Sequence, residues 1–156
     1  RGEDMDTCVA ELQALHPEYA DAIAMFRDRW FDMCHGDIPG MLEIIQDLKQ
    51  KGYGVFGLTN WPAATFAEAR RRFKTIGSID NYVVSSSVHL AKPEPAIYQL
   101  LLSRYNLNAC ECIFIDDRKD NVDAAISLGM SGIVYPGSAD RLSGILQKTL
   151  QPDKKK

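Results

Sequence analysis

Residues 112–117 read Cys-Ile-Phe-Ile-Asp-Asp, an apolar run that ends in two adjacent acids. β-branched and aromatic residues in such a run are typical of a buried strand. Asp116 and Asp117 must lie at the mouth of that strand, because burying an unpaired charge is costly. In open α/β sheets, ligands bind at the carboxyl ends of the strands. Two neighbouring carboxylates repel each other unless a cation or bases lie nearby, so this stretch predicts a cation site.

Helical and strand patterns alternate from residue 40 onward, on both sides of that strand. Apolar residues at helical spacing recur after residue 40 and stop at Gly52, and Pro62 suits the first turn of a helix. We expect strands over 53–58, 82–84, 112–115 and 133–135, and helices over 41–48, from 62, over 95–105, over 119–128 and from 142. This alternation predicts an α/β fold with a doubly wound parallel sheet covered by helices on both faces.

Two helices expected over 6–16 and 18–35 lie outside the alternation. We therefore expect a helical segment over 1–36, an α/β core over 37–150 and a charged tail over 151–156. Four cysteines without metal-ligand or paired spacing favour a reducing, cytoplasmic compartment.

The composition excludes several classes of function. An apolar content of 46% in 156 residues is enough for one globular domain. The net charge of -3 leaves no basic stripe for nucleic-acid phosphates, so nucleic acid is not expected as the partner. No apolar run approaches the ~20 residues of a membrane-spanning helix, so no membrane association is expected.

Polar residues also follow the strand that ends near Leu58. Thr59 and Asn60, with Trp61 after them, offer a hydroxyl and an amide at a strand tip beside the start of a helix. Such groups can hold an oxyanion such as phosphate. A helix cap is the simpler interpretation of the same pair, and Trp61 could line an entrance or only pack the start of the helix.

A lysine and an asparagine complete the pattern. Lys92 precedes two prolines, so a stiff loop would present its ammonium group, although an ordinary solvated lysine is the simpler interpretation. Asn121 follows the acids by one helical turn and adds oxygen ligands of the kind that suit Mg²⁺.

In this order and with these flanks, three motifs resemble those of the haloacid dehalogenase (HAD) superfamily of hydrolases. They are Gly-Leu-Thr-Asn-Trp at 57–61, Ala-Lys-Pro-Glu-Pro-Ala-Ile-Tyr at 91–98 and Phe-Ile-Asp-Asp-Arg-Lys-Asp-Asn-Val at 114–122. The resemblance covers residues from about 30 to 146. It is nearest to members with a helical cap, including sugar-phosphate phosphatases, and residues 6–35 are similar to the end of such a cap.

The resemblance implies a Rossmann-like fold and a Mg²⁺-dependent phosphatase of a small phosphorylated metabolite. An aspartate on the first strand would form an aspartyl-phosphate that water hydrolyses. By position, Asp117 resembles the Mg²⁺ ligand, with Asn121 near it and Asp116 as a helper carboxylate. Thr59 and Asn60 resemble the phosphate-holding pair, and Lys92 the cation that steadies the nucleophile and the phosphoryl group.

The nucleophile motif that the family implies, an apolar strand followed by Asp-x-Asp, has no good match here. The sequence has one Asp-x-Asp pair, Asp4 and Asp6, which lacks a preceding apolar strand. Asp6 or Thr7 is better explained as a helix cap. We therefore expect the first strand and its nucleophile to be absent from residues 1–156, and the resulting gap in the sheet to be closed.

Two other functions remain open. A 2-haloacid dehalogenase would use the same scaffold without a metal, which a carboxylate at Asp117 disfavours. An inactive homologue would act as an interaction module, with a homo-oligomer covering the gap.

Overall fold

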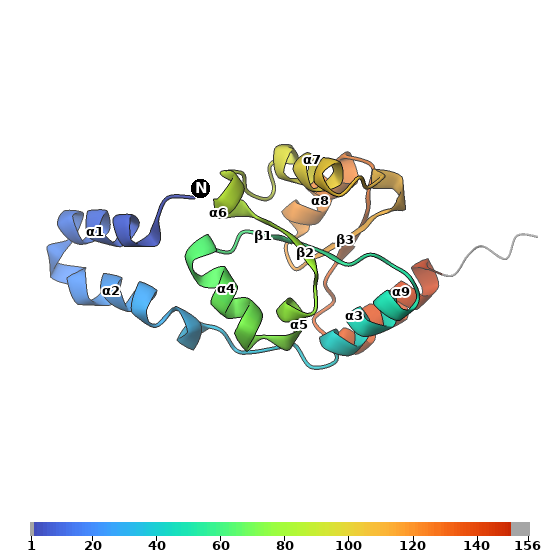
Figure 1. The fold of residues 1–156 in the computed structure, drawn as a ribbon, viewed down its shortest axis with the longest axis horizontal. Coiled ribbons are helices and arrows are strands. Elements are labelled where there is room, and N and C mark those ends of the chain that lie inside the picture. Colours follow the sequence, from blue (N-terminus) through green and yellow to red (C-terminus); the bar gives the residue numbers. More distant parts are fainter. Residues whose placement is uncertain (1, 151–156) are drawn as a thin grey trace, which may run out of the picture.

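The computed structural model describes residues 2–150, in which helices and strands alternate as predicted (Figure 1). The core contains α3 (Met41–Gln50), β1 (Phe56–Thr59), α4 (Ala63–Arg72), α5 (Lys74–Gly77), β2 (Asn81–Val84), α6 (Ser85–Val88), α7 (Pro95–Arg104), β3 (Ile113–Asp116), α8 (Lys119–Ser127), β4 (Ser131–Val134) and α9 (Ala139–Thr149). The one-turn helices α5 and α6 were not predicted, and β4 begins two residues earlier than expected.

Two glycines end helices where the sequence predicts. Gly52 and Gly129 have φ of 85° and 91°, a left-handed conformation that glycine adopts without a steric penalty. After Gly52 the backbone N–H of Tyr53 donates to the carbonyl of Leu48 at 3.0 Å, which closes the end of α3 before β1 begins. Pro62 differs from its expected place: it is the extended residue before α4 rather than part of its first turn.

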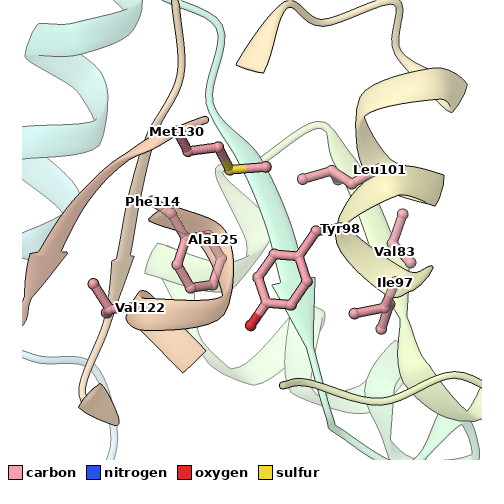
Figure 2. Close-up of a cluster of buried hydrophobic side chains, with 8 residues drawn as sticks. All are labelled: Val83, Ile97, Tyr98, Leu101, Phe114, Val122, Ala125 and Met130. Atoms are coloured by element: carbon pink, nitrogen blue, oxygen red, sulfur yellow. The ribbon is translucent and has the colours of Figure 1, made fainter. Parts of the chain in front are cut away.

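The main core joins α7 and α8 to the strands (Figure 2). Its centre is Tyr98, whose side chain is fully buried and whose ring meets that of Phe114 at 5.2 Å between centroids. The buried members are Val83, Ile97, Tyr98, Leu101, Phe114, Val122, Ala125 and Met130. Residues from β2 and β3 therefore share one core, although the two strands are not hydrogen-bonded to each other.

The strands form two separate parallel pairs. β1 pairs with β2, Phe56 opposite Asn81, and β3 pairs with β4, Ile113 opposite Ser131. In Figure 1, α7 and α8 lie on one side of the strands and α3, α4 and α9 on the other. The α/β class with parallel strands is confirmed.

The prediction that the gap in the sheet is closed is wrong. β1 and β3 do not pair within residues 2–150, and a cavity of about 500 Å³ is lined by both strands. Helix α7 packs against β2, and α8 packs against β3 and β4, so each strand pair is supported by its own helix.

The N-terminal segment is a helical hairpin that projects from the core (Figure 1). It contains α1 (Met5–Leu15), a 3₁₀ turn over Pro17–Tyr19, α2 (Ala20–Asp28) and a second 3₁₀ turn over Trp30–Met33. The second expected helix is therefore broken near Arg29. Trp30 turns there onto the core residue Trp61, with ring centroids 6.0 Å apart.

The proposed division at residue 36 stays a prediction, and the expected tail over 151–156 lies outside the described residues. All four cysteines are free thiols. Within residues 2–150, no helix has the length and apolar character to cross a membrane.

Candidate active site

Lys92 and Asp116, the two residues predicted to be catalytic, form an ion pair at the end of β3. The Nζ atom of Lys92 donates to Oδ2 of Asp116 at 2.6 Å. Only 11% and 6% of these side chains are exposed, so this is a buried pair. The solvated-loop interpretation of Lys92 is therefore wrong.

Asn60 fixes the backbone of Lys92. Its Nδ2 donates to the carbonyl of Lys92 at 3.0 Å, and the N–H of Lys92 donates to its Oδ1 at 2.9 Å. Lys92 is thus tied through its backbone to the end of β1 and through its side chain to the end of β3. The carboxyl ends of the two strands therefore meet at one site, although the strands do not pair.

Thr59 and Trp61 make local contacts beside this site. The hydroxyl of Thr59 accepts from the N–H of Trp61 at 3.1 Å, which is a capping contact. The indole N–H of Trp61 donates to Oγ1 of Thr65 at 2.8 Å, and its ring packs edge-on against those of Trp30 and Phe73. Their roles in binding substrate stay predictions.

We expect Asn60→Ala to lower the free energy of unfolding by about 1–2 kcal/mol, because two hydrogen bonds are lost. Asn81→Ala is the matched control, since Asn81 is also exposed and its side chain makes no hydrogen bond to the described residues. Urea denaturation measures both. Equal stability of the two variants would show that Asn60 does not hold the Lys92 loop.

Asn121 supports Asp116 from α8. Its Nδ2 donates to Oδ1 of Asp116 at 2.8 Å, and the N–H of Arg118 donates to the same oxygen at 3.0 Å. The Oδ1 atom of Asn121 is buried and has no hydrogen-bond partner within the described part of the chain. Buried polar atoms without a partner are rare in folded proteins, so this oxygen is a candidate contact for a ligand.

Tyr98 also supports this region, although the sequence patterns gave it no role of its own. Its hydroxyl donates to the carbonyl of Asn121 at 2.9 Å, so the core ring also holds the start of α8. Burial raises the pKa of Tyr98 to about 12, with smaller contributions from Asp116 and Asp120, so the hydroxyl keeps its proton. Its position between Ile97 and Leu101 on α7 is the signal that could have identified it.

The pKa of Asp116 is lowered on balance. Burial raises the pKa of Asp116. The hydrogen bonds from Lys92, Asn121 and the N–H of Arg118, together with the charge of Lys92, lower it by more than burial raises it. A carboxyl with a lowered folded-state pKa contributes stability above the ordinary aspartate pKa of about 3.9, and that stability is lost as pH falls through the folded-state value.

We therefore expect the free energy of unfolding to fall as pH decreases below about 4, and to fall less steeply in Asp116→Asn. Denaturation with urea at a series of pH values from neutral to acid measures both slopes. Other carboxylates with lowered pKa values, such as Asp37 and Glu68, are common to both proteins and cancel in the comparison. Identical slopes for the original chain and Asp116→Asn would contradict a lowered pKa of Asp116.

Asp117 is exposed at the same strand end, and nothing in the structure tests its predicted role as a metal ligand. Among residues 2–150, no three side chains of His, Cys, Asp or Glu gather as a metal site would require. Asp117 and Asn121 are the oxygen-bearing side chains that the sequence predicts for a cation here, and that role stays a prediction.

Comparison with known proteins decides the family. A sequence profile described as haloacid dehalogenase-like hydrolase matches residues 6–129. The chain belongs to this family.

Curated relatives include several phosphatases. The chain is 32% identical to a sesquiterpene phosphatase of Aspergillus oryzae over 60% of its length, and 30% identical to a flavin mononucleotide hydrolase of Arabidopsis thaliana over 68%. It is 32% identical to a phosphorylated carbohydrates phosphatase of Thermotoga maritima over 61%. It spans 47%, 42% and 44% of these relatives, less than half of each.

Solved HAD structures share the fold. A HAD-like hydrolase of Porphyromonas gingivalis superposes with a TM-score of 0.69 at 19% identity, over 80% of this chain and 63% of that one. A HAD family enzyme of Bacteroides thetaiotaomicron, in complex with magnesium and inorganic phosphate, superposes with a TM-score of 0.54 at 26% identity. That match covers 59% of this chain and 49% of the other. The Rossmann-like HAD fold is thereby confirmed.

The Asp-x-Asp pair makes its contacts within the N-terminal hairpin. Asp4 caps α1, where its Oδ2 accepts from the N–H of Thr7 at 3.1 Å, and Asp6 binds Arg27 at 3.0 Å. The capping interpretation is confirmed, but the capping residue is Asp4 rather than Asp6 or Thr7.

Proposed function

We propose that this chain carries the phosphate- and cation-binding half of a Mg²⁺-dependent HAD phosphatase that forms an aspartyl-phosphate. In this proposal the nucleophilic aspartate is not among residues 1–156. The substrate class is a small phosphorylated metabolite. The observation that carries the proposal is the buried Lys92–Asp116 pair, held where the ends of β1 and β3 meet.

Each residue has a defined task in this proposal. Among the described residues, the Nζ atom of Lys92 makes one hydrogen bond, to Asp116, and has two further N–H groups for a phosphoryl oxygen or a carboxylate. Asn60 holds the Lys92 backbone, so the ammonium group keeps its place as charge develops. Thr59 offers its hydroxyl at the same strand end, and Trp61 borders it. Asp116 neutralises Lys92 in the absence of substrate.

The donors beside Asp116 suit Mg²⁺. Mg²⁺ prefers oxygen ligands and is held in such sites by one or two carboxylates together with substrate phosphate and water. The exposed carboxylate of Asp117 and the unpartnered Oδ1 of Asn121 are both oxygen donors. When bound, Mg²⁺ would neutralise charge on the transferring phosphoryl group.

The relatives favour a phosphate ester as the substrate. Three of them are named for phosphate-ester hydrolysis, on a sesquiterpene, a flavin mononucleotide and carbohydrates. These substrates share the phosphoryl group and differ in the rest of the molecule. The proposal therefore names the group that is recognised and not the metabolite.

Binding of inorganic phosphate tests this proposal. Two-dimensional NMR of the 156-residue chain in Mg²⁺ should show phosphate-dependent shifts at Thr59, Asn60 and Lys92. Lys92→Met should weaken binding at least about tenfold, a loss of roughly 1.4 kcal/mol or more. Lys119→Met removes an exposed lysine and should leave binding unchanged. Saturable binding that is insensitive to Lys92→Met would refute the proposed site.

A further inference from the structure

Helices α3 and α9 lie side by side, on the same side of the strands as α4, and form a surface groove (Figure 1). Its volume is about 750 Å³. This equals the liquid volume of roughly 25 water molecules, so the groove can receive several side chains rather than a single ion. We name it the helical groove. Residues of α3, of α9 and beside their ends line it, and none of the described strands does.

The floor of the helical groove is apolar. The two helices touch near their N-terminal ends, where a Cβ atom added to Gly40 would lie 3.0 Å from the Cβ of Ala139. Farther along, Leu48 of α3 and Leu146 of α9 line the groove from its two sides. Tyr53, which follows α3, is 42% exposed at the far end. The ten residues of α3 make the groove about 15 Å long.

Both walls of the helical groove carry negative charge that the described chain leaves unpaired. Glu43 and Asp140 lie in the first turns of α3 and α9, and both are exposed. Within residues 2–150 neither side chain makes a hydrogen bond or an ion pair. The other charged lining residues, Asp47 and Lys51, pair with each other at 2.6 Å. The groove therefore has a surplus of two carboxylates, one on each wall.

These walls determine the kind of ligand. The backbone groups of α3 and α9 are bonded within their helices, so the lining residues offer no strand edge to an extended peptide. A polypeptide lying here must satisfy its own backbone N–H and C=O groups, as a helix does. Amphipathic helices dock their apolar face into such grooves. The two carboxylates favour lysine or arginine beside that apolar face, because opposite charges steer and orient the partner.

We propose that the helical groove docks a basic amphipathic helix of a partner protein. Leucine-sized side chains of that helix pack against Leu48 and Leu146, and its cationic side chains lie against Glu43 and Asp140. About three turns of helix span the length of the groove. This inference concerns an interaction surface and does not depend on the proposed phosphatase function.

Model peptides test the inference on the 156-residue chain. The probe is acetyl-Lys-Leu-Ala-Lys-Leu-Ala-Ala-Lys-Leu-Ala-Lys-Leu-Ala-Ala-amide, whose leucines share one helical face. One control has glutamate in place of every lysine, and another has alanine in place of every leucine. Isothermal titration should show one-to-one binding of the probe. Each control should bind at least about tenfold more weakly, a difference of roughly 1.4 kcal/mol. Two-dimensional NMR should show probe-dependent shifts at Ile44 and Leu48.

A charge reversal locates the contact. Glu43→Lys combined with Asp140→Lys should weaken binding of the probe at least about tenfold and should allow the glutamate peptide to bind instead. The matched control combines Glu11→Lys with Asp21→Lys, which changes the net charge equally on the exposed surface of the N-terminal hairpin. That control should leave binding of the probe unchanged. All four substituted positions are exposed, and circular dichroism confirms that both proteins fold.

Four outcomes would overturn the inference. One is the absence of binding at millimolar probe. Equal weakening by the two charge reversals would mean that only net charge attracts the peptide. Equal binding of the lysine and glutamate peptides would mean that the apolar surface alone binds them. A dimer of the peptide-free chain in sedimentation, converted to a monomer by Glu43→Lys with Asp140→Lys, would mean that a second copy fills the groove.

Discussion

Lys92→Met is expected to lower the free energy of unfolding by about 3–5 kcal/mol, because it leaves the carboxylate of Asp116 buried without its counter-ion. The side chain of Asp116 is only 6% exposed, so water cannot replace the lost ammonium group. Asn121 and the N–H of Arg118 still donate to Asp116 in the variant, which places the expected loss toward the lower end of this range. Urea denaturation at neutral pH measures it.

The control for this prediction is Lys119→Met, which breaks the exposed pair between Lys119 and Asp123. Exposed ion pairs contribute about 0–1 kcal/mol, so this variant should differ little from the original chain. A second variant, Lys92→Met with Asp116→Asn, removes both charges and should recover part of the stability. If both lysine variants lost the same free energy, the Lys92–Asp116 pair would not be a buried pair in solution.

Tyr98→Ala is expected to cost about 3–5 kcal/mol, the usual range for removing a large aromatic ring from a core. The ring is fully buried and packs edge-on against Phe114 (Figure 2). Tyr19→Ala is the control, since Tyr19 is 62% exposed and its replacement should change stability by less than about 1 kcal/mol.

Tyr98→Phe separates the packing of the ring from the bond to the site. It keeps the ring but leaves the carbonyl of Asn121 without the hydroxyl donor, which should cost about 1–2 kcal/mol. Urea denaturation of all three variants separates the contribution of the packed ring from that of the hydrogen bond to Asn121. A Phe variant as unstable as the Ala variant would mean that the hydrogen bond, and not the packing, accounts for the role of Tyr98.

Much of the fold and site could be predicted because the signals are local. Gly52 and Gly129 mark helix ends through backbone conformation, and the apolar run before Asp116 marks a strand in any context. Polar residues at strand tips predicted that Asn60, Lys92 and Asp116 would meet, since carboxyl ends of parallel strands share one edge of a sheet.

Features that depend on distant contacts could not be predicted. The break after α2 follows from the packing of Trp30 on Trp61, which are far apart in the sequence. The cap of α1 is local, but a helical pattern alone did not distinguish Asp4 from Asp6 or Thr7 as the capping residue. The open cavity between β1 and β3 contradicted the expectation of a closed gap, because each strand pair is supported by its own helices and by a shared core around Tyr98.

In the proposed function, residues 1–156 hold the binding half of a HAD phosphatase site without its nucleophile. The most direct test is hydrolysis of p-nitrophenyl phosphate by the purified 156-residue chain in Mg²⁺, compared with Asp117→Asn and Asp4→Asn. We expect no turnover above buffer for any of the three. Robust turnover that is abolished by Asp117→Asn but retained by Asp4→Asn would contradict it, because the chain would then contain a nucleophile that this account does not identify.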